Sequence, residues 1–156
     1  MVKFIKYFFQ ALIIYSFFII IKLIGLKLSR NLFSYLFNKM GPLIKSNAVI
    51  NENLDKFIGP YNENKKIKIK QKMWANYGKT FVEYLFLKRF RENNSHIKIK
   101  GEDILQEIIK KDKPVIFVSG HFANFELMSM ELTKKKIKLA SIYRPLNNFF
   151  LNPFME

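Results

Sequence analysis

A histidine and a glutamate five positions apart are the residues of this sequence best suited to chemistry. They are His121 and Glu126, the two ends of the segment HFANFE. A neutral imidazole can take a proton from a substrate hydroxyl as a general base, and a carboxylate can hold its second nitrogen. On a continuous helix, positions five apart point roughly 140° away from each other. The two side chains can therefore meet only if a turn lies between them.

The residues on either side of this pair predict such a turn. Residues 114–119 are a short, mostly apolar run typical of a buried strand, Gly120 interrupts it, and residues 125–134 have a helical pattern. His121 is then expected in a strand-to-helix loop. Glu126 is expected in the first helical turn, where the helix dipole favours a carboxylate. The alternative is a structural role, which is the more common one for a lone histidine near an acid.

A second block of residues makes the pattern around His121 and Glu126 more specific. It is IYRPLNN, residues 142–148, and it follows the next expected strand. The combination of SGHFANFEL and YRPLNN resembles the lipid A biosynthesis acyltransferases, the lauroyl/myristoyl transferase family. This resemblance implies transfer of a fatty acyl chain from acyl carrier protein to a hydroxyl of a lipid A precursor. It also implies that His121 is the general base and that Glu126 orients it.

Arg144 and Asn147 are the candidate substrate-binding residues of the second block. A guanidinium at a strand end can bind a phosphate through two parallel hydrogen bonds, and the alternative for Arg144 is a surface ion pair. Asn147, with its neighbour Asn148, either positions the acceptor or turns the chain. The sequence has no cysteine and no dense cluster of metal-ligating residue types. We therefore predict neither a thiolate nucleophile nor a metal or other cofactor.

The second half of the sequence predicts an α/β fold. An alternating pattern begins a strand at His96, residues 104–109 indicate a helix, and the run 114–119, the helix 125–134 and a strand over 137–143 follow. This βαβαβ order is typical of parallel strands with right-handed crossovers, which place a site at the carboxyl ends of the strands. The family resemblance implies a sheet of the glycerolphosphate-acyltransferase-like kind.

The first part of the sequence predicts a membrane anchor. Residues 4–26 are the most apolar stretch. Their uninterrupted middle is short for the roughly 20 residues that cross a bilayer, but lysines that reach the interface can lengthen it. A cleaved signal peptide is the alternative, although no small-x-small cleavage site follows. By the positive-inside rule, basic residues after the apolar middle place the rest of the chain in the cytoplasm: Lys22, Lys27, Arg30 and Lys39. The family resemblance implies that the membrane is the bacterial inner membrane, with the chain on its cytoplasmic face.

Three regions are expected along the chain. Residues 1–26 are the membrane anchor, residues 27–93 a helical membrane-proximal region, and residues 94–156 the N-terminal part of an α/β acyltransferase domain. An amphipathic helix of the middle region is expected to end at Gly41-Pro42. Members of the resembled family continue beyond the second block with further substrate-binding motifs. The chain is therefore predicted to be an N-terminal fragment, and catalysis by these residues alone is not expected.

The charge of the chain predicts anionic partners. The formal net charge is +15, which suits an acidic carrier protein, an anionic glycolipid acceptor and membrane phospholipids. Nucleic acid is not expected, because the basic runs are short and no nucleic-acid module surrounds them. Two alternative functions remain open. One is acylation of another glycolipid or a lysophospholipid, and the other is a non-catalytic basic membrane-surface module whose histidine and glutamate are structural.

Overall fold

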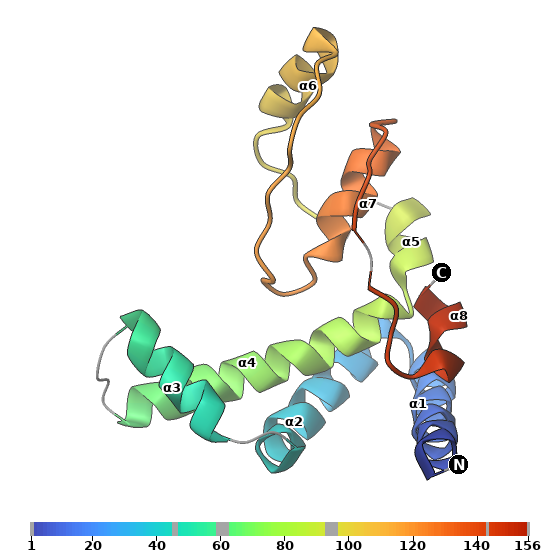
Figure 1. Cartoon of the computed structure of the whole chain (residues 1–156), viewed down its shortest axis with the longest axis vertical. Coiled ribbons are helices and arrows are strands. Elements are labelled where there is room, and N and C mark those ends of the chain that lie inside the picture. Colours follow the sequence, from blue (N-terminus) through green and yellow to red (C-terminus); the bar gives the residue numbers. More distant parts are fainter. Residues whose placement is uncertain (1, 45–46, 59–62, 93–96, 143, 156) are drawn as a thin grey trace. The chain divides into compact units, whose positions relative to one another are not determined.

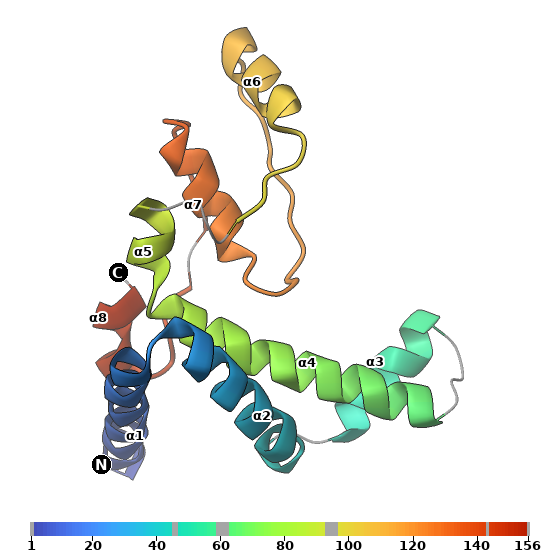
Figure 2. The ribbon, with the colours of Figure 1, turned by 180° about the vertical axis from the view of Figure 1, so that it is seen from behind.

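The computed structural model of the chain describes residues 2–44, 47–58, 63–92, 97–142 and 144–155 (Figure 1). This part of the chain is predominantly helical, and Figure 2 shows the same ribbon from behind. In chain order, the elements are α1 (Val2–Ile24), α2 (Leu26–Ile44), α3 (Asn47–Ile58), α4 (Glu63–Tyr84), α5 (Leu87–Glu92), α6 (Glu102–Lys111), α7 (Glu126–Lys134), the 3-10 helix η2 (Phe149–Leu151) and α8 (Asn152–Met155).

The predicted α/β sheet is wrong. None of the described residues forms a strand, and the segments 97–99, 113–122 and 137–142 have no regular secondary structure. An apolar run favours an extended chain, but a strand also needs a neighbour that takes up its backbone hydrogen bonds. Ile116, expected inside a sheet, is accordingly 90% exposed. His96, expected to begin the first strand, lies outside the described residues.

The two helices predicted near the candidate site are confirmed as α6 and α7. Their charges agree with the helix dipole, which favours acids in the first turn and bases in the last. In α6, Glu102 and Asp103 occupy the first turn and Lys110 and Lys111 the last. In α7, Glu126 opens the helix.

Residues 18–86 form one compact unit, in which α2 and α4 pack side by side. Its buried side chains include Ile21 at the end of α1, Phe33 of α2 and Val82 of α4. The Phe81 ring stacks on Phe33, with ring centroids 5.6 Å apart and an angle of 26° between the planes. Aromatic packing between α2 and α4 is therefore the centre of this unit.

Close approach of α2 and α4 depends on glycine. A Cβ added at Gly78 of α4 would collide with the backbone of Phe33 and Ser34 in α2. On α2, a Cβ at Gly41 would fall on the indole ring of Trp74. Each glycine thus lets the other helix come nearer than a side chain would allow.

The predicted end of a helix at Gly41-Pro42 is also wrong, because α2 continues to Ile44 with Pro42 inside it. Proline removes one backbone donor from a helix. Near the last turn this loss is small, and contact of Gly41 with Trp74 holds the backbone in place. Tertiary packing therefore overrides the local stop signal.

Lys66 joins α3 to α4. Its Nζ lies 2.9 Å from Asp55 Oδ1 in α3 and 2.9 Å from Glu63 Oε1 in the first turn of α4. The side chain is buried, with 11% exposed. Hydrogen bonds to Glu63 and then to Asp55 raise the pKa of Lys66 above its ordinary value of 10.5, against the opposing effect of burial.

This pKa predicts how the α3–α4 contact depends on pH. Because the pKa is raised in the folded chain, the stabilisation from Lys66 is present below pH 10.5 and is lost as pH rises through the raised pKa. We expect Lys66→Met to lower the free energy of unfolding at neutral pH. In strongly alkaline solution, the unfolding free energies of the variant and of wild type should become more similar. Fluorescence of Trp74, the single tryptophan, reports the unfolding.

Lys56→Met is the matched control for this prediction. Lys56 forms an exposed i,i+4 pair with Glu52, and such pairs contribute only a few tenths of a kcal/mol. Two results would contradict the role given to Lys66. One is an equal loss of unfolding free energy in Lys56→Met and Lys66→Met. The other is a difference between Lys66→Met and wild type that stays the same at all pH values.

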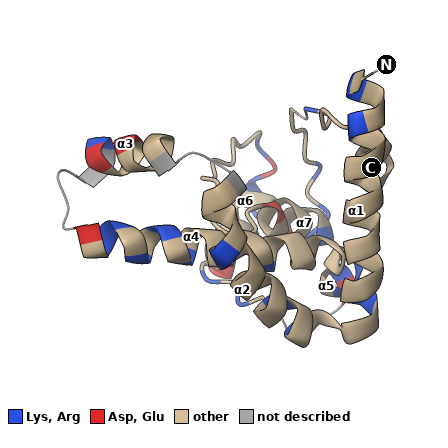
Figure 3. Cartoon of the chain, turned by 90° about the horizontal axis from the view of Figure 1, so that it is seen from below, with Lys and Arg blue, Asp and Glu red and all other residues tan. Residues whose placement is uncertain are grey.

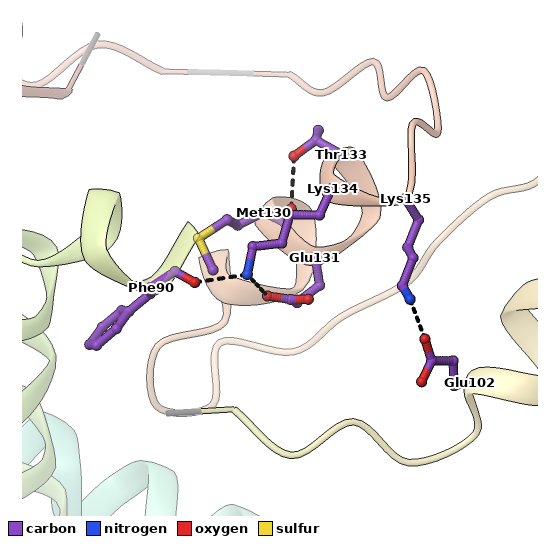
Figure 4. Close-up of polar contacts among 7 residues, drawn as sticks. All are labelled: Phe90, Glu102, Met130, Glu131, Thr133, Lys134 and Lys135. Atoms are coloured by element: carbon purple, nitrogen blue, oxygen red, sulfur yellow. Dashed lines mark hydrogen bonds and ion pairs between the residues drawn. The ribbon is translucent and has the colours of Figure 1, made fainter. Parts of the chain in front are cut away.

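The second compact unit comprises residues 1–17 and 87–156. In it α7 is held against α5 by a lysine: Lys134 Nζ donates to the Phe90 carbonyl and to Glu131 Oε1, both at 2.7 Å (Figure 4). Figure 4 also shows Lys135 paired with Glu102 of α6. At the other end of this unit, η2 and α8 lie beside the N-terminal part of α1.

Candidate functional site

A turn separates His121 from Glu126, as the sequence predicts. Ala123 has a φ of 49°, in the left-handed region, and two backbone hydrogen bonds wind the chain into α7. These are Leu127 N to Asn124 O at 3.3 Å and Met128 N to Phe125 O at 3.1 Å. The predicted place of Glu126 in the first helical turn is confirmed, and its side chain is half-buried.

The side chains of His121 and Glu126 do not meet in this conformation. His121 is exposed, and its ring lies against Phe125, with centroids 4.3 Å apart and a tilt of 55°. No hydrogen bond or ion pair in the described part of the chain joins the histidine to the glutamate. The pair therefore lies on either side of one turn, and its catalytic roles stay a prediction.

Arg144 and Asn147 are both exposed, in the segment that leads to η2. Within the described contacts neither has a hydrogen bond or ion pair, and neither is joined to His121 or Glu126. The arginine is thus not engaged in the surface ion pair that was its alternative role. Both side chains are accessible to a ligand.

Asn148, by contrast, has a structural role. It is buried. Its Oδ1 accepts a hydrogen bond from Phe150 N at 3.1 Å, and its Nδ2 donates to the Tyr7 carbonyl of α1 at 2.9 Å. An asparagine before a helical turn is a familiar N-cap, so the first contact has a local sequence signal. The contact with Tyr7 has none, because 141 positions separate the two residues.

An apolar pocket lies along α7, immediately after Glu126. It has a volume of about 290 Å³. No local sequence pattern predicts it, since its walls come from three separate segments: residues 97–100, α6, and α7 with the residue that follows it. The lining residues are Ile97, Ile99, Lys100, Leu105, Leu127, Met128, Glu131, Leu132 and Lys135. A concave surface with mostly apolar walls and a few polar groups is typical of a binding site for an apolar ligand.

Metal-ligating residues do not gather in the part of the chain that the structure describes, where no three of His, Cys, Asp and Glu come together. The absence of a metal or other cofactor stays a prediction.

Helix α1 is, among the described helices, the one that is long and apolar enough to cross a membrane. Only 17% of its most apolar window is buried. A core helix of a soluble protein would be mostly buried, so its exposure favours contact with lipid.

Comparison with known protein families agrees with the sequence resemblance. The family model described as bacterial lipid A biosynthesis acyltransferase matches residues 2–155, and the protein is accordingly an acyltransferase. It belongs to the bacterial lipid A biosynthesis acyltransferase family. No curated protein and no solved structure matches the chain.

Proposed function

We propose that the protein transfers a fatty acyl chain from acyl carrier protein to a hydroxyl of a lipid A precursor, at the cytoplasmic face of the bacterial inner membrane. The family match over residues 2–155 carries this proposal. The turn between His121 and Glu126 supports it, because a continuous helix would point the two side chains away from each other.

His121 acts as the general base in the proposed reaction. Its neutral imidazole takes the proton of the acceptor hydroxyl while the oxygen attacks the thioester carbonyl carbon. The carbon–sulfur bond then breaks, the carrier thiolate leaves and takes up a proton, and an ester remains on the acceptor. For this step the ring of His121 turns away from Phe125, with which it is now in contact.

Glu126 is a positioning residue. Its carboxylate holds the imidazole in the productive orientation and stabilises the imidazolium that forms. We expect Glu126→Gln to lower kcat more than KM and to shift the acidic limb of the pH–rate profile to lower pH, since a neutral amide no longer favours the protonated ring. A purely structural glutamate would leave the position of that limb unchanged.

Arg144 binds an anionic group of the acceptor, assisted by Asn147. The side chain is exposed and engages no acid in the described contacts, so its guanidinium can form two hydrogen bonds to a phosphate. We expect Arg144→Lys to raise KM for the acceptor about 10- to 100-fold, the effect of losing a charged hydrogen bond. Arg91→Lys, at an exposed site on α5, is the control and should leave KM unchanged; equal effects would remove Arg144 from the site.

The apolar pocket along α7 offers a surface for part of the acyl chain. It begins at Leu127, next to Glu126, and six of its lining side chains are apolar. An acyl chain in this pocket would keep its thioester near the turn that carries His121.

Basic residues on α4 support anionic partners for the unit of residues 18–86 (Figure 3). Its acids Glu52, Asp55, Glu63 and Glu83 are all engaged in ion pairs. Lys68, Lys72 and Lys79 have no acidic partner in the described contacts. Their spacing places them on one face of α4, where they can attract phospholipid headgroups or the acidic carrier.

The experiment that tests the proposal compares acceptors. The complete reading frame that encodes this chain, in detergent with acyl carrier protein thioester, is offered a lipid A precursor, a different glycolipid and a lysophospholipid in parallel. Preferred acylation of the lipid A precursor supports the proposal. Preference for either of the other acceptors would show that the protein is an acyltransferase whose acceptor is not a lipid A precursor.

A further inference from the structure

Helix α2 has an exposed apolar face. Leu28, Leu32, Tyr35 and Leu43 have 65%, 42%, 61% and 84% of their surface exposed. At about 100° per residue, all four lie within an arc of about 80° around the helix, and the row runs about 22 Å along its axis. These four residues are the outer face of α2. A continuous row of this kind, unlike single apolar residues scattered over a surface, indicates a contact with an apolar partner.

The outer face is separate from the two other sides of α2. One of these packs on α4 through Phe33 and Gly41, both of which are buried. The other is polar, and its residues follow one another at helical spacing: Lys27, Asn31 and Asn38. The helix is therefore amphipathic apart from the side that packs on α4.

The start of α2 is fixed to the end of α1, the helix whose exposure favours contact with lipid. Gly25 alone separates the two helices, and its φ of 78° lies in the left-handed region. Ser29, which is fully buried, closes the corner. Its backbone N–H donates to the Gly25 carbonyl at 3.1 Å, and its hydroxyl donates to the Ile21 carbonyl at 3.2 Å. Because residues 18–86 form one compact unit, lipid around the end of α1 lies next to the start of α2.

The charges of α2 suit an anionic surface. The helix contains Lys27, Arg30 and Lys39 and no acidic residue. Arg30 pairs with Glu83 of α4, whereas neither lysine has an acidic partner in the described contacts. By its spacing Lys39 belongs to the outer face, and its Nζ lies 5.9 Å from the centroid of the Tyr35 ring. A tyrosine beside a lysine that extends its charge to the headgroups is typical of the membrane interface.

Two other arrangements of the outer face fit these observations less well. A second copy of the chain on this face would enclose the unpaired Lys39 of both copies in an apolar interface, with no acid of α2 to neutralise them. A crossing of the bilayer by α2 is not supported, because among the described helices α1 is the one apolar enough to cross. A helix with one apolar face and unpaired basic residues lies on the membrane surface.

We propose that α2 lies in the interface of the membrane, parallel to its surface, with its outer face toward the acyl chains of anionic phospholipids and Lys27 and Lys39 at their phosphates. The inference rests on the proposed membrane attachment through α1 and adds a second contact with lipid. The unit of residues 18–86 is thereby held on the bilayer by α2 as well as by α1. This geometry is independent of which acceptor is acylated.

The absence of cysteine from the sequence allows a test with single thiols in the full chain. Leu32→Cys places a thiol on the outer face and Asn31→Cys places one on the neighbouring polar side, both at exposed positions. Each thiol is labelled with an environment-sensitive fluorophore, and the chain is reconstituted into vesicles of phosphatidylethanolamine and phosphatidylglycerol. Brominated acyl chains quench from the lipid and iodide quenches from the water. At Leu32 we expect a blue shift and loss of fluorescence with brominated lipid and little loss with iodide; at Asn31 we expect the opposite order.

Four results would overturn the proposal. Quenching of the Leu32 probe by iodide alone would place the outer face in water, and equal quenching of both probes by brominated lipid would remove the orientation of the helix. Protection of the Leu32 probe from both quenchers would place protein on the outer face; a disulfide between two oxidised Leu32→Cys chains would identify that protein as a second copy. Chains that do not sediment with the vesicles would overturn membrane attachment itself. Acyl transfer is measured separately in detergent, so failure of the proposed reaction is distinguishable from each of these results.

Discussion

Replacement of His121 by alanine is expected to lower the rate of acyl transfer about 10²- to 10⁴-fold, the usual contribution of general acid–base catalysis. The imidazole is the proposed acceptor of the hydroxyl proton, and the sequence offers one other histidine, His96. The measurement is steady-state transfer with saturating acceptor. Because the His121 side chain is exposed and its ring lies against Phe125 at the protein surface, we expect the variant to fold and to remain attached to membranes.

His96→Ala is the matched control for this variant, since it removes the same side chain from the chain's other histidine. It should retain wild-type activity. Equal losses in the two variants would indicate a general effect of histidine removal, and full activity of His121→Ala would exclude it as the base. Loss of folding is monitored by Trp74 fluorescence, which reports the unit of residues 18–86, and by membrane sedimentation.

Replacement of Gly78 by alanine is expected to destabilise the unit of residues 18–86 by about 1 to 3 kcal/mol, the usual cost of overpacking. Helix propensity alone predicts the opposite sign, because alanine is favoured over glycine in a helix interior by about 1 kcal/mol. The new methyl group would collide with the Phe33 backbone, which cannot move aside as a flexible side chain can. Denaturant unfolding followed by Trp74 fluorescence measures the change.

Lys72→Ala provides the comparison on the same helix. Lys72 is exposed on α4, so its replacement should change the free energy of unfolding by less than about 0.5 kcal/mol. A Gly78→Ala protein as stable as wild type, or more stable, would show that α2 and α4 do not approach each other at this point.

Local sequence signals predicted helices well and the sheet badly. The acids and bases at the two ends of α6 and the position of Glu126 at the start of α7 are local features, and both helices are present. Strand formation is a non-local property: the run 114–119 has the residue types of a strand, but it has no partner strand among the described residues and no regular secondary structure. The helix stop at Gly41-Pro42 failed for a similar reason, because Trp74 packs on Gly41.

The candidate site could be predicted only in part. The turn between His121 and Glu126 follows from their spacing and from the residues that flank them. The contact of Asn148 with Tyr7 and the pocket along α7 could not be predicted, since each depends on segments far apart in the sequence. Sequence patterns thus identified the residues whose types can react. The tertiary contacts of the structure identify the residues that fix the surrounding segments in place.

Acyl transfer from acyl carrier protein to a lipid A precursor, measured for wild type beside His121→Ala, tests the central claim most directly. The complete reading frame is used in detergent, and the product is identified by its added acyl mass. The predicted result is transfer by wild type that falls at least about 10²-fold in the variant. A folded wild-type protein that transfers nothing to this acceptor, or a His121→Ala variant that transfers at the wild-type rate, would contradict the proposed reaction or its proposed base.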